Sequence, residues 1–150
     1  MGRNEENDLY PIEQVREVLE GLPHFRELGI ILVEIKRGSC TARLDAAPRL
    51  AGNPETGAVH GGVITTLLDS VGGAAAFSII RRDQTVATLD LRIDYLRASE
   101  PGQAIYGRAE CYRLARSVAF VRGTAYCKEA EPLAQCAATF MVGSVGFSLR

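Results

Sequence analysis

The sequence lacks tryptophan, has only two histidines and carries almost no net charge. Its 17 basic and 18 acidic residues give a formal charge of −1, so no global attraction to nucleic acid or to an anionic membrane is expected. The four cysteines include no Cys-x-x-Cys pair, and neither histidine has a suitably spaced partner ligand. We therefore expect no metal site, and reduced thiols that are mostly buried.

Signals for secretion and for membrane insertion are also missing. The N-terminal stretch MGRNEENDLY contains no apolar run and does not resemble a secretory signal. The one long apolar segment, residues 59–80, is interrupted by Asp69 and four glycines, so a membrane span is not expected. A cytoplasmic protein with one core is predicted, since 150 residues suit a single domain.

Hydrophobic periodicity predicts two strands, one long helix and then four strands. A polar segment, Met1–Leu9, precedes a short helix from Pro11 to Glu20, whose apolar stripe includes Val15, Val18 and Leu19. Strands are predicted at 30–35, 40–46, 86–97, 103–114, 117–128 and 133–145. Short turns separate the last four, so they are predicted to pair consecutively as an antiparallel meander. The lone helix then packs on the concave face of the sheet, which is an α+β arrangement.

The predicted strand at 86–97 has two distinct faces. The apolar face, expected to meet the helix, consists of Leu89, Leu91, Ile93 and Tyr95. The polar face consists of Thr88, Asp90, Arg92 and Asp94. The strand is expected to be central in the sheet, so we expect its polar face to meet solvent or a second pair of subunits.

The long helix, predicted from about Gly61 to Ile80, begins with the sequence His60-Gly61-Gly62. The first N–H groups of a helix lack partners and carry partial positive charge, and glycine allows another group to approach them. Such a helix start can hold an oxyanion or a polarised carbonyl oxygen. The glycines can equally provide only a tight entry turn. His60 can be a cap, a substrate contact or a general base.

Asp69 is the second unusual feature of this helix, because an unpaired buried carboxylate costs several kcal/mol. One interpretation is that Asp69 is a functional carboxylate in a cleft or at a subunit contact. The other is that it lies on the surface or is paired with an arginine elsewhere in the chain. It follows Gly61 by eight residues, which is about 12 Å along a helix axis. Catalytic groups must lie within about 3 Å of the same reacting atom. If both residues are catalytic, two antiparallel copies must meet about a two-fold axis.

The stretch GNPETGAVHGGVITTLLDSVGGAAA, residues 52–76, resembles the signature of the PaaI-like thioesterases. These are hotdog-fold acyl-CoA hydrolases, named for phenylacetate catabolism. The resemblance continues through TLDLRIDYLR and AQCAATFMV and covers most of the chain beyond Gly29. It implies a hotdog domain at 30–150, preceded by a tail and short helix at 1–29. The implied activity is hydrolysis of a small or medium acyl- or aryl-acyl-CoA.

The resemblance also implies roles for five residues. Gly61 matches the residue whose backbone N–H polarises the thioester carbonyl, and Asp69 matches the carboxylate that acts as nucleophile or as general base on water. Asn53 matches a polar residue near the thioester or the attacking water. Thr88 lies where relatives often carry Ser or Thr near that water or the carboxylate. His60 matches a histidine that shapes the site.

Coenzyme A enters as part of the substrate, so no separate cofactor is implied. Its phosphates require cations, and Arg97, Arg113 and Arg116 lie at or near predicted strand ends. The family implies a homodimer with shared sites, and a dimer of dimers. The segment between Asn53 and His60 is one residue longer than in typical relatives, and the proline expected after Arg97 is delayed to Pro101.

Two other functions remain open at this point. The first is an acyl-CoA binding or regulatory module without turnover, although such a module has no need of a buried carboxylate. The second is a hotdog dehydratase, but the Asp-x-x-x-x-His order usual in those enzymes is missing here.

Overall fold

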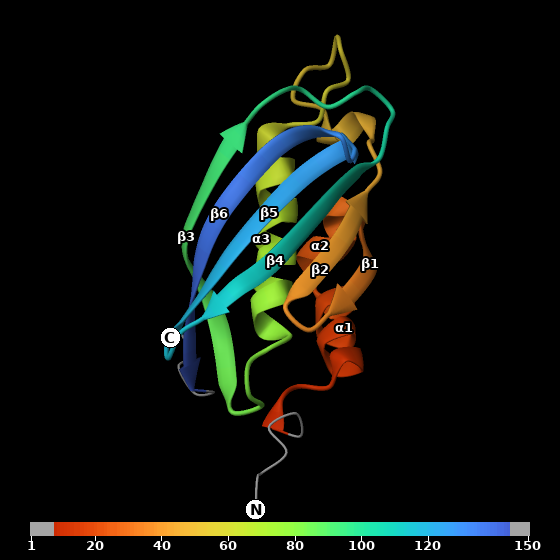
Figure 1. The fold of residues 1–150 in the computed structure, drawn as a ribbon. Helices are drawn as coiled ribbons and strands as arrows, with labels where there is room; N and C mark the ends of the chain where they lie inside the picture. The colour runs from red at the N-terminus through yellow and green to blue at the C-terminus, as the bar shows by residue number, and fades with distance from the viewer. Residues whose placement is uncertain (1–7, 145–150) are drawn as a thin grey trace, which may run out of the picture.

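One curved sheet wraps around a single long helix in the computed structural model, which describes residues 8–144 (Figure 1). The long helix is α3 (Gly61–Phe77). The strands are β1 (Ile30–Lys36), β2 (Ser39–Leu44), β3 (Gln84–Tyr95), β4 (Ile105–Leu114), β5 (Val118–Lys128) and β6 (Glu131–Ser144). The predicted α+β hotdog arrangement is therefore confirmed. Residues 1–7 of the polar N-terminal segment, and Val145 of the last predicted strand, lie outside the described residues.

Two short helices precede the sheet and pack beside α3 (Figure 1). The first, α1 (Ile12–Gly21), buries Val15 and Leu19, and the second, α2 (Pro23–Leu28), buries Phe25. Pro23 occupies the first turn of α2, where its missing N–H costs nothing. Within residues 8–144, none of the helices has the length and apolar character that crossing a membrane requires.

The six strands are antiparallel in the order β1-β2-β4-β5-β6-β3. Strands β4, β5 and β6 form the predicted meander, but the prediction that β3 pairs with β4 is wrong. Strand β3 pairs with β6 and lies at the edge, so its polar face is not central to the sheet. The connection at 96–104 is longer than a tight hairpin turn, and it crosses the end of the sheet to reach β4 (Figure 1).

A β-bulge in β3 changes which of its residues face the helix. Thr88 pairs with the buried Phe140, and the register then shifts before Asp90. The extra residue, Leu89, is 56% exposed. A bulge reverses the alternation of side chains, so Thr88 joins Ile93 on the helix side. The predicted strict alternation is therefore wrong at Thr88 and Leu89.

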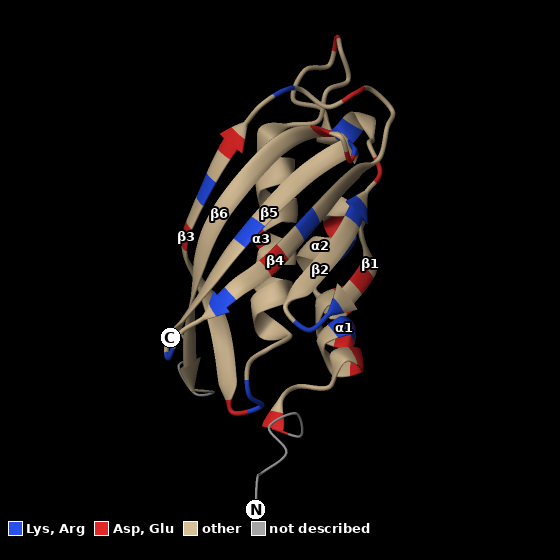
Figure 2. Cartoon of the chain, viewed as in Figure 1, with Lys and Arg blue, Asp and Glu red and all other residues tan. Residues whose placement is uncertain are grey.

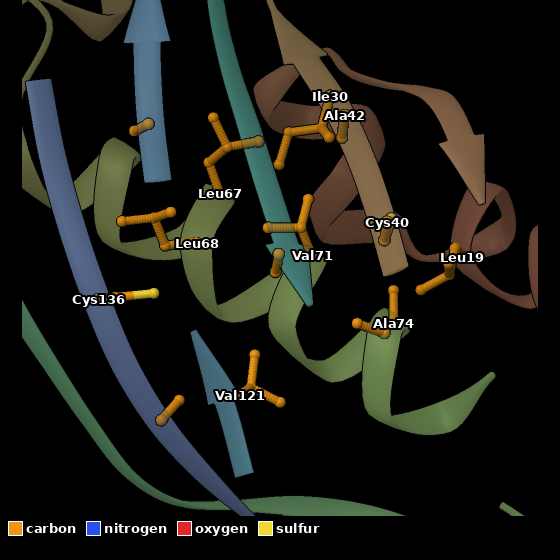
Figure 3. Packing of buried hydrophobic residues seen from close by; sticks show 14 of the residues in the cluster. Leu19, Ile30, Cys40, Ala42, Leu67, Leu68, Val71, Ala74, Val121 and Cys136 are labelled. Carbon is orange, nitrogen blue, oxygen red and sulfur yellow. The ribbon is translucent and has the colours of Figure 1, made fainter. Parts of the chain in front are cut away.

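The core lies between α3 and the concave face of the sheet. Leu67, Leu68 and Val71 of α3 are fully buried and point toward the strands (Figure 3). All four cysteines are free thiols, as predicted. Burial raises the pKa of Cys40 to about 12 and is the main reason why the pKa of Cys136 is about 11.

Candidate active site

His60 caps the start of α3. Its backbone is extended, and its Nδ1 accepts a 2.9 Å hydrogen bond from the Gly62 N–H. A Cβ at position 62 would lie only 3.0 Å from that nitrogen, so glycine leaves room for the cap. The Gly62 N–H is thus engaged by the protein itself, and His60 has the capping geometry that the sequence left open.

The two backbone polar groups of Gly61 differ: its carbonyl oxygen is hydrogen-bonded, and its N–H is available as a donor. Its carbonyl oxygen accepts hydrogen bonds from the Tyr95 hydroxyl at 2.9 Å and from Thr65 Oγ1 at 3.1 Å. The Tyr95 and Thr65 hydroxyls also contact each other. Within residues 8–144, the Gly61 N–H has no hydrogen-bond acceptor. The start of α3 therefore presents a fixed donor at the positive end of the helix dipole.

Tyr95 is a site residue that the sequence interpretation missed. Alternation along β3 correctly indicated that its side chain faces the helix. No local pattern could indicate that its hydroxyl reaches Gly61, which lies 34 positions earlier in the chain. Such a contact depends on how the end of β3 is placed beside the start of α3.

Asn53 is an exposed residue of the loop before α3, and this loop projects beyond the sheet (Figure 1). Its Oδ1 accepts hydrogen bonds from the N–H groups of Glu55, at 2.9 Å, and Thr56, at 3.4 Å. A Cβ on Gly52 would come within 2.9 Å of His60 Cα, so glycine permits the close return of this loop. Within one chain, Asn53 shapes its own turn and is not brought to Asp69.

Asp69 is the one charged residue of α3 and is half-buried. Its Oδ1 accepts a 2.9 Å hydrogen bond from Thr88 Oγ1, a contact that depends on the bulge in β3. None of the ion pairs among the described residues involves Asp69, so the alternative of a distant arginine partner is not realised there. Its charge also adds to the effect of burial in raising the pKa of the Cys136 thiol.

A groove of about 350 Å³ opens beside Asp69. Its polar end contains Asp69, Ser70 and Thr88, and the remainder is mostly apolar. A larger hollow, of about 610 Å³, lies elsewhere and includes Arg122 and Glu110, which pair with each other at 3.0 Å. The smaller groove is the better candidate for a site, since it contains an unpaired carboxylate next to apolar surface.

The predicted catalytic residues form two groups within one chain. Gly61 and His60 lie at the start of α3, while Asp69 and Thr88 lie at its middle, about 12 Å along the axis. No single reacting atom can contact both groups. Each chain thus contains a hydrogen-bond donor at one place and a carboxylate at another.

The three arginines predicted to bind CoA phosphates are also separated. Arg97 follows β3 and forms ion pairs with Glu131 at 3.1 Å and with Glu100 at 3.4 Å. Arg113 is next to the last residue of β4, and Arg116 lies in the connection to β5. Because β3 and β4 run in opposite directions, Arg97 lies at the end of the sheet opposite to the other two, and Figure 2 shows positive charge at both ends.

Comparisons with known proteins match the chain to thioesterases and to solved structures of the same fold. Residues 56–134 match the thioesterase superfamily. The chain is 29% identical over 135 residues to YigI of Escherichia coli, a medium/long-chain acyl-CoA thioesterase, and the match covers 81% of this chain and 86% of YigI. A solved structure from Pseudomonas aeruginosa is 40% identical, with a TM-score of 0.77 over 87% of this chain and 98% of that chain. A phenylacetic acid degradation-related protein from Ralstonia eutropha is 26% identical, with a TM-score of 0.73, covering 85% and 98%.

Proposed function

Because the chain belongs to the thioesterase superfamily, as its match over residues 56–134 shows, we propose that it hydrolyses acyl-CoA at a site that two subunits share. Thioester hydrolysis is the activity of its family. The observation that carries the shared site is the separation, on one helix, of a free Gly61 N–H from the unpaired Asp69 carboxylate. Each is half of a catalytic pair, and neither half can use the other in its own chain.

A two-fold axis beside β3 would bring the halves together. Strand β3 lies at the edge of the sheet, and within residues 8–144 it pairs with β6 alone. Pairing of two β3 edges would continue the sheet across a dimer and would remove an exposed edge. The two α3 helices would then lie antiparallel, with Asp69 of each facing Gly61 of the other. The projecting loop with Asn53 would reach the same place.

The proposed chemistry requires one carboxylate and one oxyanion donor. The Gly61 N–H would bind the thioester carbonyl oxygen, where negative charge develops during attack. If Asp69 is a general base, it takes a proton from water, the resulting hydroxide attacks the carbonyl carbon, and the C–S bond breaks. The electron pair leaves on sulfur, and the thiolate then takes up the proton to give the free acid and CoA.

Asp69 can also attack the carbonyl carbon directly. That route expels the thiolate and leaves an acyl–Asp69 anhydride, which water then hydrolyses. A single turnover in ¹⁸O-labelled water tests for this route. Label in the Asp69 carboxylate requires the anhydride, because water must then open it at the Asp69 carbonyl. Label in the product acid is formed both by the general base and by an anhydride opened at the acyl carbonyl.

In either route Thr88 would orient the carboxylate through its 2.9 Å hydrogen bond. His60 would act indirectly, because its Nδ1 already accepts the Gly62 N–H and leaves Gly61 as the donor for substrate. We propose that Asn53 contacts the thioester or the water from the partner's loop. Of the arginines, Arg113 and Arg116 form no ion pair among residues 8–144 and remain the better candidates for CoA phosphates.

The substrate class proposed is a medium-chain acyl-CoA. Two observations support it: the apolar groove that continues from Asp69, and the 29% identical relative that is a medium/long-chain acyl-CoA thioesterase. An arylacyl group such as phenylacetyl remains a second substrate to test. A cytoplasmic location and a dimer of dimers belong to the same proposal, and the latter can be measured by sedimentation.

The function is tested by steady-state release of CoA thiol from a panel of acyl-CoA esters, with the wild type, Asp69→Ala and Asp45→Ala. Asp45 is an exposed carboxylate that follows β2, away from the β3 edge, and serves as the matched control. The proposal expects Asp69→Ala to lose nearly all activity and Asp45→Ala to retain it. Full activity of Asp69→Ala would refute the mechanism, and tight acyl-CoA binding by the wild type without thiol release would favour a binding module.

A further inference from the structure

The groove beside Asp69 has one wall that comes from the N-terminal helices. Its floor is α3, with Ala74 and Phe77, and one side is the beginning of β3, with Val86. The other side is made by Val18 of α1, by Leu22 in the junction between α1 and α2, and by Phe25 of α2. The matched thioesterase segment begins at residue 56, so this second wall lies outside it.

Val18 and Leu22 are apolar residues left exposed at this wall. Val15 and Leu19 of α1 are buried in the core at 0% and 7% exposure, whereas Val18 of α1 and Leu22 just after it are 46% and 41% exposed. The apolar stripe of α1 is therefore wider than the core needs. Its surplus faces the groove, where it is available to an apolar ligand.

Small residues on α3 keep the groove open opposite this wall. Gly73 and Ala74 lie on the groove side of the helix and carry little or no side chain. A Cβ at position 73 would already be 3.4 Å from Phe140, which lines the groove from β6. The hollow therefore depends on the absence of side chains on α3 and on the apolar side chains of α1.

The polarity of the groove fixes the direction in which a substrate would lie. Among its lining residues, Asp69 is the one ionisable group, and it lies at the same end as Thr88. A thioester carbonyl must approach that carboxylate, so the apolar part receives the acyl chain and not the phosphates of CoA. From Asp69 to Phe77 the floor runs about 12 Å along the helix, the length of an extended chain of about nine carbons.

We infer that α1 and the start of α2 form the distal wall of the acyl site, and that Val18 and Leu22 set the preferred chain length. This inference rests on the proposed thioesterase function, and it adds a specificity element from outside the matched segment. Each methylene that enters the groove contributes about fourfold to kcat/KM, the factor that corresponds to about 0.8 kcal/mol. The gain stops where the chain reaches the end of the floor.

The test measures kcat/KM for butyryl-, hexanoyl-, octanoyl-, decanoyl- and dodecanoyl-CoA with wild type, Val18→Trp and Val33→Trp. Val33 lies on β1 and is 49% exposed, which matches Val18, but it does not line the groove. Val18→Trp fills part of the hollow, so the ratio of decanoyl- to butyryl-CoA should fall at least tenfold. Val33→Trp should keep the wild-type ratio. Leu22→Ala, which enlarges the hollow, should move the plateau toward dodecanoyl-CoA.

Each outcome of this test either supports or refutes the role of Val18 in chain-length preference. A selective loss of long-chain activity in Val18→Trp supports the inference. A ratio that stays equal to that of Val33→Trp refutes it while leaving the thioesterase function intact. An equal loss on all esters also refutes it, because Val18 would then act through the fold, and thermal unfolding of the variant would report the change. Absence of hydrolysis by the wild type on every ester would refute the proposed function instead.

Discussion

Gly61→Pro removes a single hydrogen-bond donor from the proposed site while leaving the fold undisturbed. Proline lacks the backbone N–H and is well accepted at the first position of a helix, which is where Gly61 lies. The preceding residue, His60, has φ −60° and ψ 136°, the conformation that residues before proline prefer. The lost N–H has no acceptor within residues 8–144, so its removal costs no internal hydrogen bond.

The expected effect on catalysis is large and that on stability is small. Loss of one oxyanion donor typically lowers kcat by about 100- to 1,000-fold, which is roughly 3–4 kcal/mol. The same substitution restricts the unfolded chain and should change the free energy of unfolding by less than about 1 kcal/mol. A Cβ at this position would lie 3.4 Å from the Tyr95 ring, at the close limit of ordinary contact.

Gly61→Ala is the matched control, because it adds the same Cβ and keeps the N–H. Thiol release and urea unfolding should be measured on both variants. We expect Gly61→Ala to retain most of the wild-type kcat and Gly61→Pro to lose it, with similar unfolding midpoints for the two. If the proline variant were as active as the alanine variant, the Gly61 N–H would not be the oxyanion donor.

Mixing two inactive variants tests whether the site is shared. Refolding Gly61→Pro together with Asp69→Ala in equal amounts gives mixed dimers for half of the population. Each mixed dimer then has one site with both groups intact, so about a quarter of the wild-type activity should return. No recovery, with mixed dimers demonstrated by mass, would show that each chain works alone.

Three further predictions concern the supports of the site and the core. Tyr95→Phe removes the hydroxyl that holds the Gly61 carbonyl, and steady-state kinetics should show kcat lowered about three- to tenfold with little change in KM. Burial raises the pKa of Cys40 from 9.0 to about 12, so the unfolded thiol ionises first above pH 9. Urea unfolding should then reveal about 1.4 kcal/mol less stability near pH 10 than in Cys40→Ala, each referred to its own value at neutral pH. Gly107→Ala would place a Cβ 2.7 Å from Leu67 Cγ, and calorimetry should show about 1–3 kcal/mol of destabilisation.

Much of the fold follows from local patterns that the sequence displays directly. The α3 segment is apolar over many turns, and the strands are long and separated by recognisable turns, so the elements and the sheet-on-helix arrangement were predictable. The position of β3 was not, because pairing depends on where the connection at 96–104 leads. That connection is hydrogen-bonded to the start of β6, through Leu96 N–H to Leu133 O at 2.8 Å, and this contact is not encoded by any nearby periodicity.

The candidate site was predictable to a different extent. Asp69 and Gly61 were found because each breaks a local rule: a charge in an apolar helix, and glycine at a helix start. The contact between Thr88 and Asp69 was expected from family resemblance, yet simple alternation placed Thr88 on the wrong face. The bulge at Leu89 corrects that face, and one inserted residue leaves little trace in a strand of this length.

The bulge and the edge position of β3 together explain why the carboxylate can be useful. The bulge turns Thr88 toward α3 and fixes one oxygen of Asp69, while no strand among residues 8–144 pairs with the other edge of β3. A carboxylate in the interior of a single-chain core would be costly, but one beside an unpaired sheet edge is partly hydrated until a second subunit arrives. Dimerisation would then dehydrate Asp69 at the same step that delivers the Gly61 N–H of the partner subunit. Assembly and catalytic competence should therefore appear together, with the same dependence on protein concentration.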